Sequence, residues 1–595
     1  MLPVPWIAVG VTGHRHPRLP VANSDAVGDA ITWCLTRIRD EAAALVAGDD
    51  DCLADAALHC RLVTSLAEGS DTIAANRALL AGYRIDACLP FERDEFARDF
   101  GAEALTAYRA ALSSCRTVTE LPGNRRDELG AYEAAGRMVL DQSDLLIAVW
   151  DGSPALGRGG TAEIVAEAVL AHVPVVIIDV DGALATMLWS GLDEAGHDRP
   201  TVEGVPRCAF DQCIGRVMQT LMSPPTNPLD LAMIGRWQRE TDHRRSPALG
   251  YPILLAMVAG KPLSRPDFRP STAADCRRPF DEWIAQLPDM GQLGGRLKQL
   301  VAPRFGRADA SASYFAQLFR SGFIVNFAFA ALAVLLGLMG LLVPHGKLYF
   351  AIAELGVIAV ILANTRSARN RGWHERWMDN RHLAERLRVL ALSAALGDPE
   401  LRVGVDDAGS LPGWVQWMAR ATGRELGLPA GRIDQGYLER VKAAMLTLVD
   451  EQIAYNHRNA RRMERVERRL HNFGELLFAV TVLACGSWII AKLVRPDLMV
   501  GEGVGPTQFV TVATAFFPAL GAAIYGIRMQ GDFHGMAHRS ETTARLLARL
   551  KRAIECDAPD YDIMKDRVKR LGDILLMDVE GWRTTYQARP LHLPG

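Results

Sequence analysis

VGVTGHR, residues 9–15, joins a short apolar run to a glycine, a histidine and an arginine. Alternating valines are typical of a buried β-strand, and Gly13 allows the chain to turn sharply where the strand ends. In parallel α/β sheets, ligands bind beyond the carboxyl ends of the strands. The stretch therefore predicts that the chain opens with a strand whose end faces a ligand.

Four further strand-like runs follow the first one, at residues 61–65, 84–89, 145–150 and 173–179. Helical stretches such as residues 71–81 and 161–171 separate them. Such alternation predicts an α/β Rossmann-like domain, a parallel sheet with helices on both faces. We expect this domain to span residues 1–185.

Polar and glycine-rich residues gather where these strands end. Glycines before a helix allow an anion to approach the backbone, and the first N–H groups of the helix point at it. An arginine can bind phosphate, and carboxylates can accept hydrogen bonds from ribose hydroxyls. The candidate ligand-binding residues are Gly13, His14, Arg15, Glu68, Gly69, Asp71, Asp151, Gly152, Gly159, Gly160, Thr161 and Glu163.

Each of these turns also has a purely structural explanation. Glycine is a common turn residue, Ser70 or Thr161 is a suitable helix cap, and His14 fits a solvent-facing turn. The convergence of the turns favours ligand binding over the structural explanation, because in a parallel sheet all of them would meet at one edge.

Three motifs carry a resemblance to a known family: VGVTGHR, SLAEGSDTIAANRALLAGYRIDACLPF and AVWDGSPALGRGGTAEIVAEAV. Over roughly residues 4–180 the chain resembles the SLOG superfamily, Rossmann-like domains related to the LOG phosphoribohydrolases and DprA. The resemblance implies a pocket for a nucleotide-derived ligand, such as ADP-ribose or a cyclic nucleotide, and no other cofactor.

The hydrolases of that superfamily carry their catalytic glutamate in the motif PGGxGTxxE. Here GRGGTAE places Glu163 only two residues after Thr161. One residue of a helix corresponds to a rotation of about 100°. We therefore expect ligand binding without a catalytic residue. The alternative is a membrane-tethered phosphoribohydrolase or glycohydrolase in which Glu68, Asp71 or Glu163 handles the proton or the ribose.

Composition excludes several other classes. The formal net charge of -3 gives no reason to expect nucleic acid as a partner, and the ten cysteines form no CxxC pair, which predicts free thiols and no metal site. The sequence contains no HExxH motif and no complete P-loop. The N-terminus lacks the basic region of a secretory signal, so we expect a strand there.

The second half of the chain contains four long apolar runs, residues 321–343, 348–363, 473–494 and 508–527. Their lengths predict four transmembrane helices in two hairpins; buried core helices are the alternative. The expected divisions are a coupling region (186–314), hairpin 1 (315–365), cytoplasmic helices (366–472), hairpin 2 (473–528) and C-terminal cytoplasmic helices (529–595).

Arginines gather before the first and third runs and after the second, for example at Arg320, Arg371 and Arg469. The positive-inside rule then predicts a multi-pass protein of the bacterial cell membrane with both termini in the cytoplasm. Glu354 lies inside the second run and is the pore candidate; a bond to Asn326 or a position near the interface would explain it equally.

RWMDNRHLAERLRVL places Trp377, Arg381 and Glu385 on one helix face, where the last two can pair. With the paired runs, this half resembles the SLATT class of transmembrane effector modules, which accompany SLOG domains in bacterial conflict systems. The resemblance implies an antiphage effector or ion channel, gated by a nucleotide second messenger. Its expected partners are that messenger, membrane lipids and further copies of the chain; a transporter with a vestigial pocket is another possibility.

Overall fold

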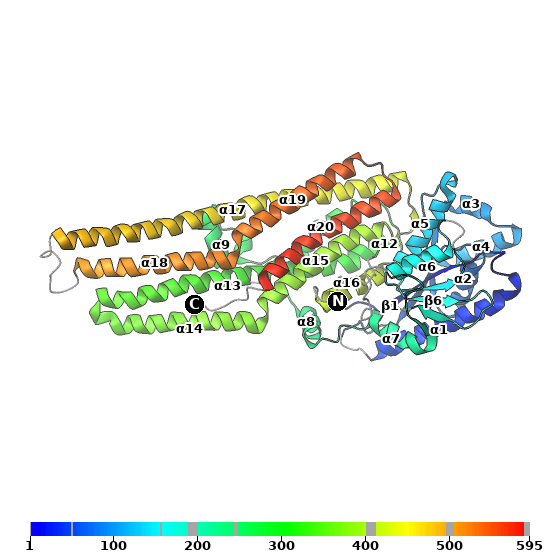
Figure 1. Ribbon diagram of the computed structural model, residues 1–595, viewed down its shortest axis with the longest axis horizontal. Coiled ribbons are helices and arrows are strands. Elements are labelled where there is room, and N and C mark those ends of the chain that lie inside the picture. The colour runs from blue at the N-terminus through cyan, green and yellow to red at the C-terminus, as the bar shows by residue number, and fades with distance from the viewer. Residues whose placement is uncertain are drawn as a thin grey trace.

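The computed structural model describes residues 2–48, 52–154, 158–188, 200–242, 248–399, 412–494 and 505–587. The molecule is elongated: an α/β domain forms one end, and the apolar parts of four long helices form the other (Figure 1). A body of further helices lies between them.

The α/β domain is built on one nine-stranded sheet with the order β8-β7-β6-β5-β1-β2-β3-β4-β9. The adjacent strands β6, β5, β1, β2, β3, β4 and β9 are parallel to one another. The pairs β6–β7 and β7–β8 are antiparallel. The strands are β1 (Trp6–Gly13), β2 (His59–Thr64), β3 (Arg84–Leu89), β4 (Cys115–Glu120), β5 (Leu145–Val149), β6 (Val175–Ile178), β7 (Thr186–Leu188), β8 (Arg207–Ala209) and β9 (Gly431–Arg432).

The expected parallel sheet is present except at its antiparallel strands β7 and β8, and all five predicted strands are found, the first beginning at Trp6. Four strands were not predicted: β4, β7, β8 and β9. The sheet therefore continues past residue 185, and its last strand comes from the distant segment Gly431–Arg432.

Successive side chains of a strand point to opposite faces, and the two faces of this sheet bury different helices. Ile7, Val9 and Val11 pack toward α1 (Ser24–Ala47) and α7 (Phe210–Met222). On the other face, Leu146 and Ala148 pack against α6 (Thr161–Leu170). The remaining helices of the domain are α2 (Ser70–Leu80), α3 (Arg93–Phe96), α4 (Ala102–Ser113) and α5 (Glu128–Asp141).

Four helices are long and apolar enough to cross a membrane. They contain α13 (Ala302–Leu342), α14 (Lys347–Arg371), α17 (Gln435–Val494) and α18 (Pro506–Gly531). Within the apolar parts, α13 packs against α14 and α18, and α18 packs against α17. Many large apolar side chains of these parts, such as Ile352 and Leu483, point away from the protein, as lipid-facing residues do.

The body between the two ends shares a core with the sheet. Cys88 of β3 and Met138 of α5 lie in the same cluster as Leu387 and Trp414 from the helical half. The helices here are α8 (Pro228–Arg239), α9 (Gly250–Leu254), α10 (Arg265–Phe268), α11 (Ala273–Ile284), α12 (Gln292–Arg296), α15 (Trp373–Ala395), α16 (Gly413–Leu426), α19 (Phe533–Cys556) and α20 (Tyr561–Gln587).

A buried ion pair reinforces this junction. Arg424, near the end of α16, donates from Nε to the Asp144 carboxylate over 2.7 Å, and both side chains are almost fully buried. The second Asp144 oxygen accepts the backbone N–H of Ala8 in β1. The helical half is therefore fixed directly to the central strand.

Two polar features of the helical half bear on the sequence predictions. The ion pair between Arg381 and Glu385 is confirmed, with a distance of 2.6 Å. Asn326 bonds to Asn364 and Thr365 of α14, while the partly buried Glu354 lies against Gly337 of α13. A bond between Glu354 and Asn326 is therefore not formed.

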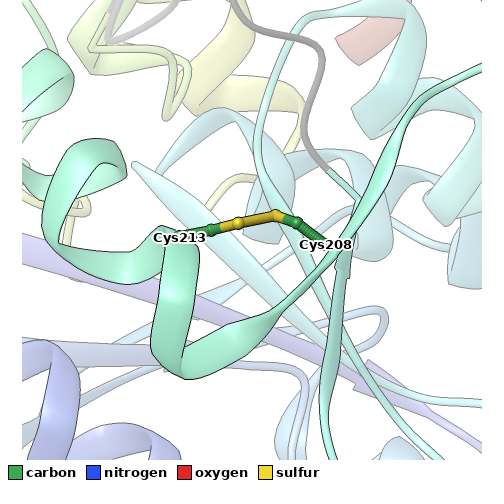
Figure 2. The surroundings of a disulfide bond; sticks show 2 residues. All are labelled: Cys208 and Cys213. Carbon is green, nitrogen blue, oxygen red and sulfur yellow. A yellow bond between two sulfur atoms is a disulfide. The ribbon is translucent and has the colours of Figure 1, made fainter.

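The cysteines differ from expectation at one place. Cys208 of β8 and Cys213 of α7 are joined by a disulfide (Figure 2), whereas the other eight cysteines are free. The expectation that all thiols are free was wrong for this pair, because the turn between β8 and α7 brings the two Cα atoms to 6.4 Å.

Candidate functional site

The turns after β1, β2 and β5 meet at the carboxyl edge of the sheet. Gly13 is paired with Val149 in the parallel register, and the backbone N–H of His14 donates to the carbonyl of Val149 at 3.1 Å. Ser70 Oγ donates to the carbonyl of His14 at 2.8 Å. The sequence-predicted residues that follow these three strands are therefore neighbours in space.

His14 is buried and forms part of the wall of this edge. Its side chain is 6% exposed, and its Nε2 lies 2.9 Å from Asp151 Oδ1. Burial alone would raise the pKa of Asp151, but hydrogen bonds from the Ser153 N–H and from His14 lower it to about 2. The alternative that His14 is a solvent-facing residue is wrong, since its ring joins two turns.

Arg15 is the exposed cation at the edge. Its guanidinium lies 4.4 Å from the centre of the Tyr132 ring, and the Tyr132 hydroxyl donates to Asp99. Burial and the neighbouring Asp99 raise the pKa of Tyr132 to about 12, so the phenol stays neutral. Stacking orients the plane of the Arg15 guanidinium, which favours bidentate contact with an anion.

The turn after β2 requires glycine. Gly69 has φ of +94°, and a Cβ at this position would lie 2.8 Å from the carbonyl oxygen of His14. Gly69 is the N-cap of α2, so the backbone of β1 and the start of this helix are in direct contact. The side chain of Glu68 is partly exposed beside them.

Asp71 in the first turn of α2 is buried. Its carboxylate accepts hydrogen bonds from the Ser65 hydroxyl and the Ala67 N–H. Burial raises the pKa of Asp71, while the bond from Ser65 and the charge of Arg15 act in the opposite direction. These bonds hold the loop closed, so Glu68 is better placed than Asp71 to meet a ligand hydroxyl.

The glycine-rich turn before α6 is held by the helix that follows it. Gly160 is the N-cap, and the helix begins at Thr161. Gly159 has φ of +77° and donates its N–H to Glu163 Oε2 at 2.6 Å. Thr161 therefore does not cap the helix, and the Glu163 carboxylate serves to stabilise the turn.

Gly159 also lies directly on α5. A Cβ at Gly159 would be 2.6 Å from the backbone nitrogen of Glu133. Gly152 differs, because a Cβ there would meet no atom within 4 Å and only its φ of +76° favours glycine. The close packing of Gly159 brings the start of α6 toward the same edge as the start of α2.

Three carboxylates, those of Glu133, Glu163 and Glu167, have oxygen atoms within 4.8 Å of one another. Arg137 pairs with Glu133 at 2.6 Å and with Glu167 at 2.7 Å, and Arg158 pairs with Glu133 at 2.7 Å. Two guanidiniums thus neutralise most of this acidic charge, and the group acts as an ion-pair network beneath the glycine-rich turn.

The starts of α2 and α6 give this edge its electrostatic character. The aligned peptide dipoles of each helix place partial positive charge at its first turn, which stabilises an anion nearby. Arg15 adds a full positive charge beside the β1 turn. The arrangement is suited to a phosphate or pyrophosphate group.

Sequence reasoning missed Tyr132 and Glu133 of α5, which contact Arg15 and Gly159. No local motif marks them, because both lie on a helix whose strand, β4, was not predicted. In comparisons with known proteins, no family model matches the chain and no curated protein matches it.

Proposed function

We infer that the protein is a membrane effector whose α/β domain binds a nucleotide-derived ligand and whose four apolar helices form the output. The observation that carries this inference is a direct connection between the two parts. β9 extends the sheet at β4, and α17 begins at Gln435 directly after β9. A helix of 60 residues is about 90 Å long, so α17 reaches from the sheet into the third apolar segment.

The sensing half of the proposal is supported by the edge of the sheet. Arg15, the starts of α2 and α6, and two glycine turns in contact with neighbouring backbone form a site suited to phosphate. Glu68 would accept hydrogen bonds from a ribose. The ligand class, a nucleotide second messenger of the ADP-ribose or cyclic-nucleotide type, follows from the resemblance to the SLOG superfamily.

The output half is supported by the apolar helices. Arginines flank them on the side of the sheet, which favours insertion in the bacterial cell membrane with the sheet and both termini in the cytoplasm. A single four-helix protomer encloses little space, so the active form would be a homo-oligomer with Glu354 near its conducting path. Ion flux or membrane disruption on ligand binding would suit an antiphage role.

Binding can change the output only if the ligand prefers one of two arrangements of the chain. Arg432 pairs with Glu92 at 2.8 Å, and the Thr119 hydroxyl donates to the carbonyl of Pro429. These contacts lie at the carboxyl edge, since Thr119 and Glu120 end β4. A ligand that shifts this edge would therefore shift the start of α17.

Hydrolysis of the ligand is the competing proposal. The Glu163 carboxylate is occupied by the Gly159 N–H, and Asp71 is buried within its own loop. Neither of these two carboxylates is a free general base or nucleophile. Glu68 is partly exposed, and we assign it to the ribose hydroxyls. We therefore favour a sensor over a phosphoribohydrolase.

Equilibrium dialysis of the full chain in neutral detergent tests the sensing half. The chain is dialysed against mono-, di- and cyclic nucleotides and ADP-ribose isomers, and both chambers are analysed by chromatography. We expect one compound to accumulate intact, with binding about tenfold weaker in Arg15→Ala, since a charge-assisted bond contributes about 1.5–3 kcal/mol. Arg39→Ala, which alters a half-exposed arginine of α1, is the control and should bind normally.

The same chain in liposomes tests the output half. The ligand identified by dialysis should release a trapped ion from vesicles containing wild type, and release should be lost in Arg15→Ala at the same concentration. Free base in the dialysate would establish an enzyme, and binding without ligand-dependent release would refute the effector proposal.

A further inference from the structure

A cavity of about 370 Å³ lies in the helical body, remote from the carboxyl edge of the sheet. α13, α15 and α17 form most of its wall, and α9 with its π-helical continuation Leu255–Ala259 adds a further side. Cavities of this size hold small ligands. The position of this one is informative, because its residue Arg320 directly precedes the apolar run that starts at residue 321.

The wall of the cavity is strongly cationic. It contains Lys261, Arg320, Arg381, Arg458 and Arg462, with Asp267 as the acidic residue among them. Lys261 pairs with Asp267 at 3.0 Å, and Arg381 pairs with Glu385 at 2.6 Å. Within the described ranges, no carboxylate pairs with Arg458 or Arg462 of α17. An anion in the cavity would meet charge that the protein itself does not neutralise.

Aromatic rings fix one of these cations in place. The guanidinium of Arg320 lies 5.2 Å from the centre of the Tyr251 ring and 4.8 Å from that of Trp377. Rings on a guanidinium limit its rotation, so its N–H groups are pre-organised for an oxyanion. The amide of Asn459, bonded to Ser540 at 2.9 Å, supplies further polar atoms nearby.

Apolar residues complete the wall together with further polar ones, and include Leu255, Ala312, Ala316 and Val579. A site that combines cations with apolar side chains suits an amphiphile with a phosphate ester. Tryptophans and arginines at the end of an apolar helix mark the depth of lipid headgroups. Arg320, one residue before the first apolar run, places the cavity at that depth when the four helices are inserted.

We propose that this cavity is a regulatory binding site for the phosphate ester of an anionic phospholipid such as phosphatidylglycerol. The phosphate binds Arg458, Arg462 and Arg320, and the glycerol and upper acyl chain contact the apolar residues Leu255 and Val579. Occupancy joins α13 to α17, which belong to different hairpins, and so favours one arrangement of the four helices. The inference rests on the proposed membrane insertion but is independent of the nucleotide site.

The test is native mass spectrometry of the full chain in neutral detergent, titrated with phosphatidylglycerol or phosphatidylcholine. We expect one retained phosphatidylglycerol per chain and weaker retention of phosphatidylcholine. The double variant Arg458→Gln, Arg462→Gln should bind phosphatidylglycerol about tenfold more weakly or worse, since two charge-assisted contacts are lost. Its thermal unfolding midpoint, measured in parallel, should match that of wild type.

The matched control is Arg461→Gln, Arg468→Gln, which removes two exposed arginines of the same helix outside the cavity. It should retain the lipid as wild type does. Equal loss in both double variants would overturn the proposal, because binding would then be a general effect of basic charge.

Glycerol 3-phosphate and AMP form the soluble arm of the experiment. If neither compound displaces the lipid at millimolar concentration, the cavity is a site for the lipid headgroup. Displacement that depends on Arg458 and Arg462 would instead assign the cavity to a soluble phosphate and overturn the lipid source. Native mass spectrometry measures lipid binding in detergent and does not depend on nucleotide-gated ion flux. The lipid result can therefore be interpreted even when the effector proposal fails.

Discussion

Ile433 donates its backbone N–H to the carbonyl oxygen of Glu120 at 2.9 Å, where Glu120 ends β4 and Ile433 lies two residues before the start of α17. The bond continues the pairing of Glu120 with Arg432. The chain therefore leaves the edge of the sheet and enters α17, the helix that contains the third apolar segment, within a few residues. A change of register here would break the backbone bonds that join these few residues to β4. The junction therefore connects the sheet to the start of α17 through backbone hydrogen bonds.

Replacing Ile433 by proline should weaken this link. Proline has no N–H to donate to Glu120 and also removes part of a buried side chain. We expect lower thermal stability and loss of ligand-dependent ion release with ligand binding retained, measured by dialysis and liposome flux. Ile433→Val, which keeps the N–H and most of the apolar volume, should behave like wild type, and equal loss in both variants would contradict the role of the bond.

Gly69→Ala should destabilise the ligand-binding edge. The added Cβ would meet the carbonyl oxygen of His14 at 2.8 Å, and φ of +94° is itself unfavourable for alanine. The expected cost is about 2 kcal/mol or more in the free energy of unfolding. Gly82→Ala is the control, since Gly82 has φ of +81° but an open environment, and it should cost about 1 kcal/mol. Equal costs would show that the contact with His14 is unimportant.

Arg424→Met should be strongly destabilising. The substitution leaves the Asp144 carboxylate buried without its 2.7 Å partner, which costs about 3–5 kcal/mol. Adding Asp144→Asn should recover much of that loss, because an amide oxygen can still accept the Ala8 N–H. Arg570→Met, at an exposed pair, should cost less than about 1 kcal/mol, as measured by thermal unfolding.

Lowering the pH should remove the stability that the hydrogen bonds to the ionised Asp151 carboxylate contribute. A free aspartate has a pKa of about 4, whereas hydrogen bonds lower that of folded Asp151 to about 2. The ionised carboxylate therefore adds stability above about pH 4, and this contribution is lost as the pH falls toward about 2. The unfolding midpoint of Asp151→Asn should fall less than that of wild type between pH 4 and pH 2. Asp25→Asn, at a fully exposed carboxylate, should follow wild type.

Gly526→Ala should disturb the contact between the first and fourth apolar helices. A Cβ on Gly526 of α18 would overlap the ring of Phe327 of α13, and overpacking costs about 1–3 kcal/mol. Gly486→Ala in α17 meets no atom within 4 Å and should be neutral or slightly stabilising. Thermal unfolding in detergent compares them, and an unchanged midpoint for Gly526→Ala would mean that the two helices are not packed this closely.

The sequence alone determined the elements with strong periodicity or length. Five strands could be read from short apolar runs, and four apolar helices from stretches longer than a core helix needs. The candidate site was predictable as a set of turns, because parallel strands necessarily bring their carboxyl ends to one edge. The strand β4 was missed since CRTVTE, residues 115–120, has only Cys115 and Val118 as apolar residues and so neither an apolar run nor a regular alternation.

Only the tertiary structure decided which residues meet across long separations. Nothing local marks Gly431–Arg432 as a strand, since two residues acquire that role only beside Thr119 and Glu120. Tyr132 beneath Arg15 and the cationic cavity at Arg320 likewise depend on helices that pack from distant parts of the chain. Local sequence determines periodicity and turn geometry. Which residue pairs with a buried charge, and which segment pairs with a free strand edge, is determined only when the whole chain packs.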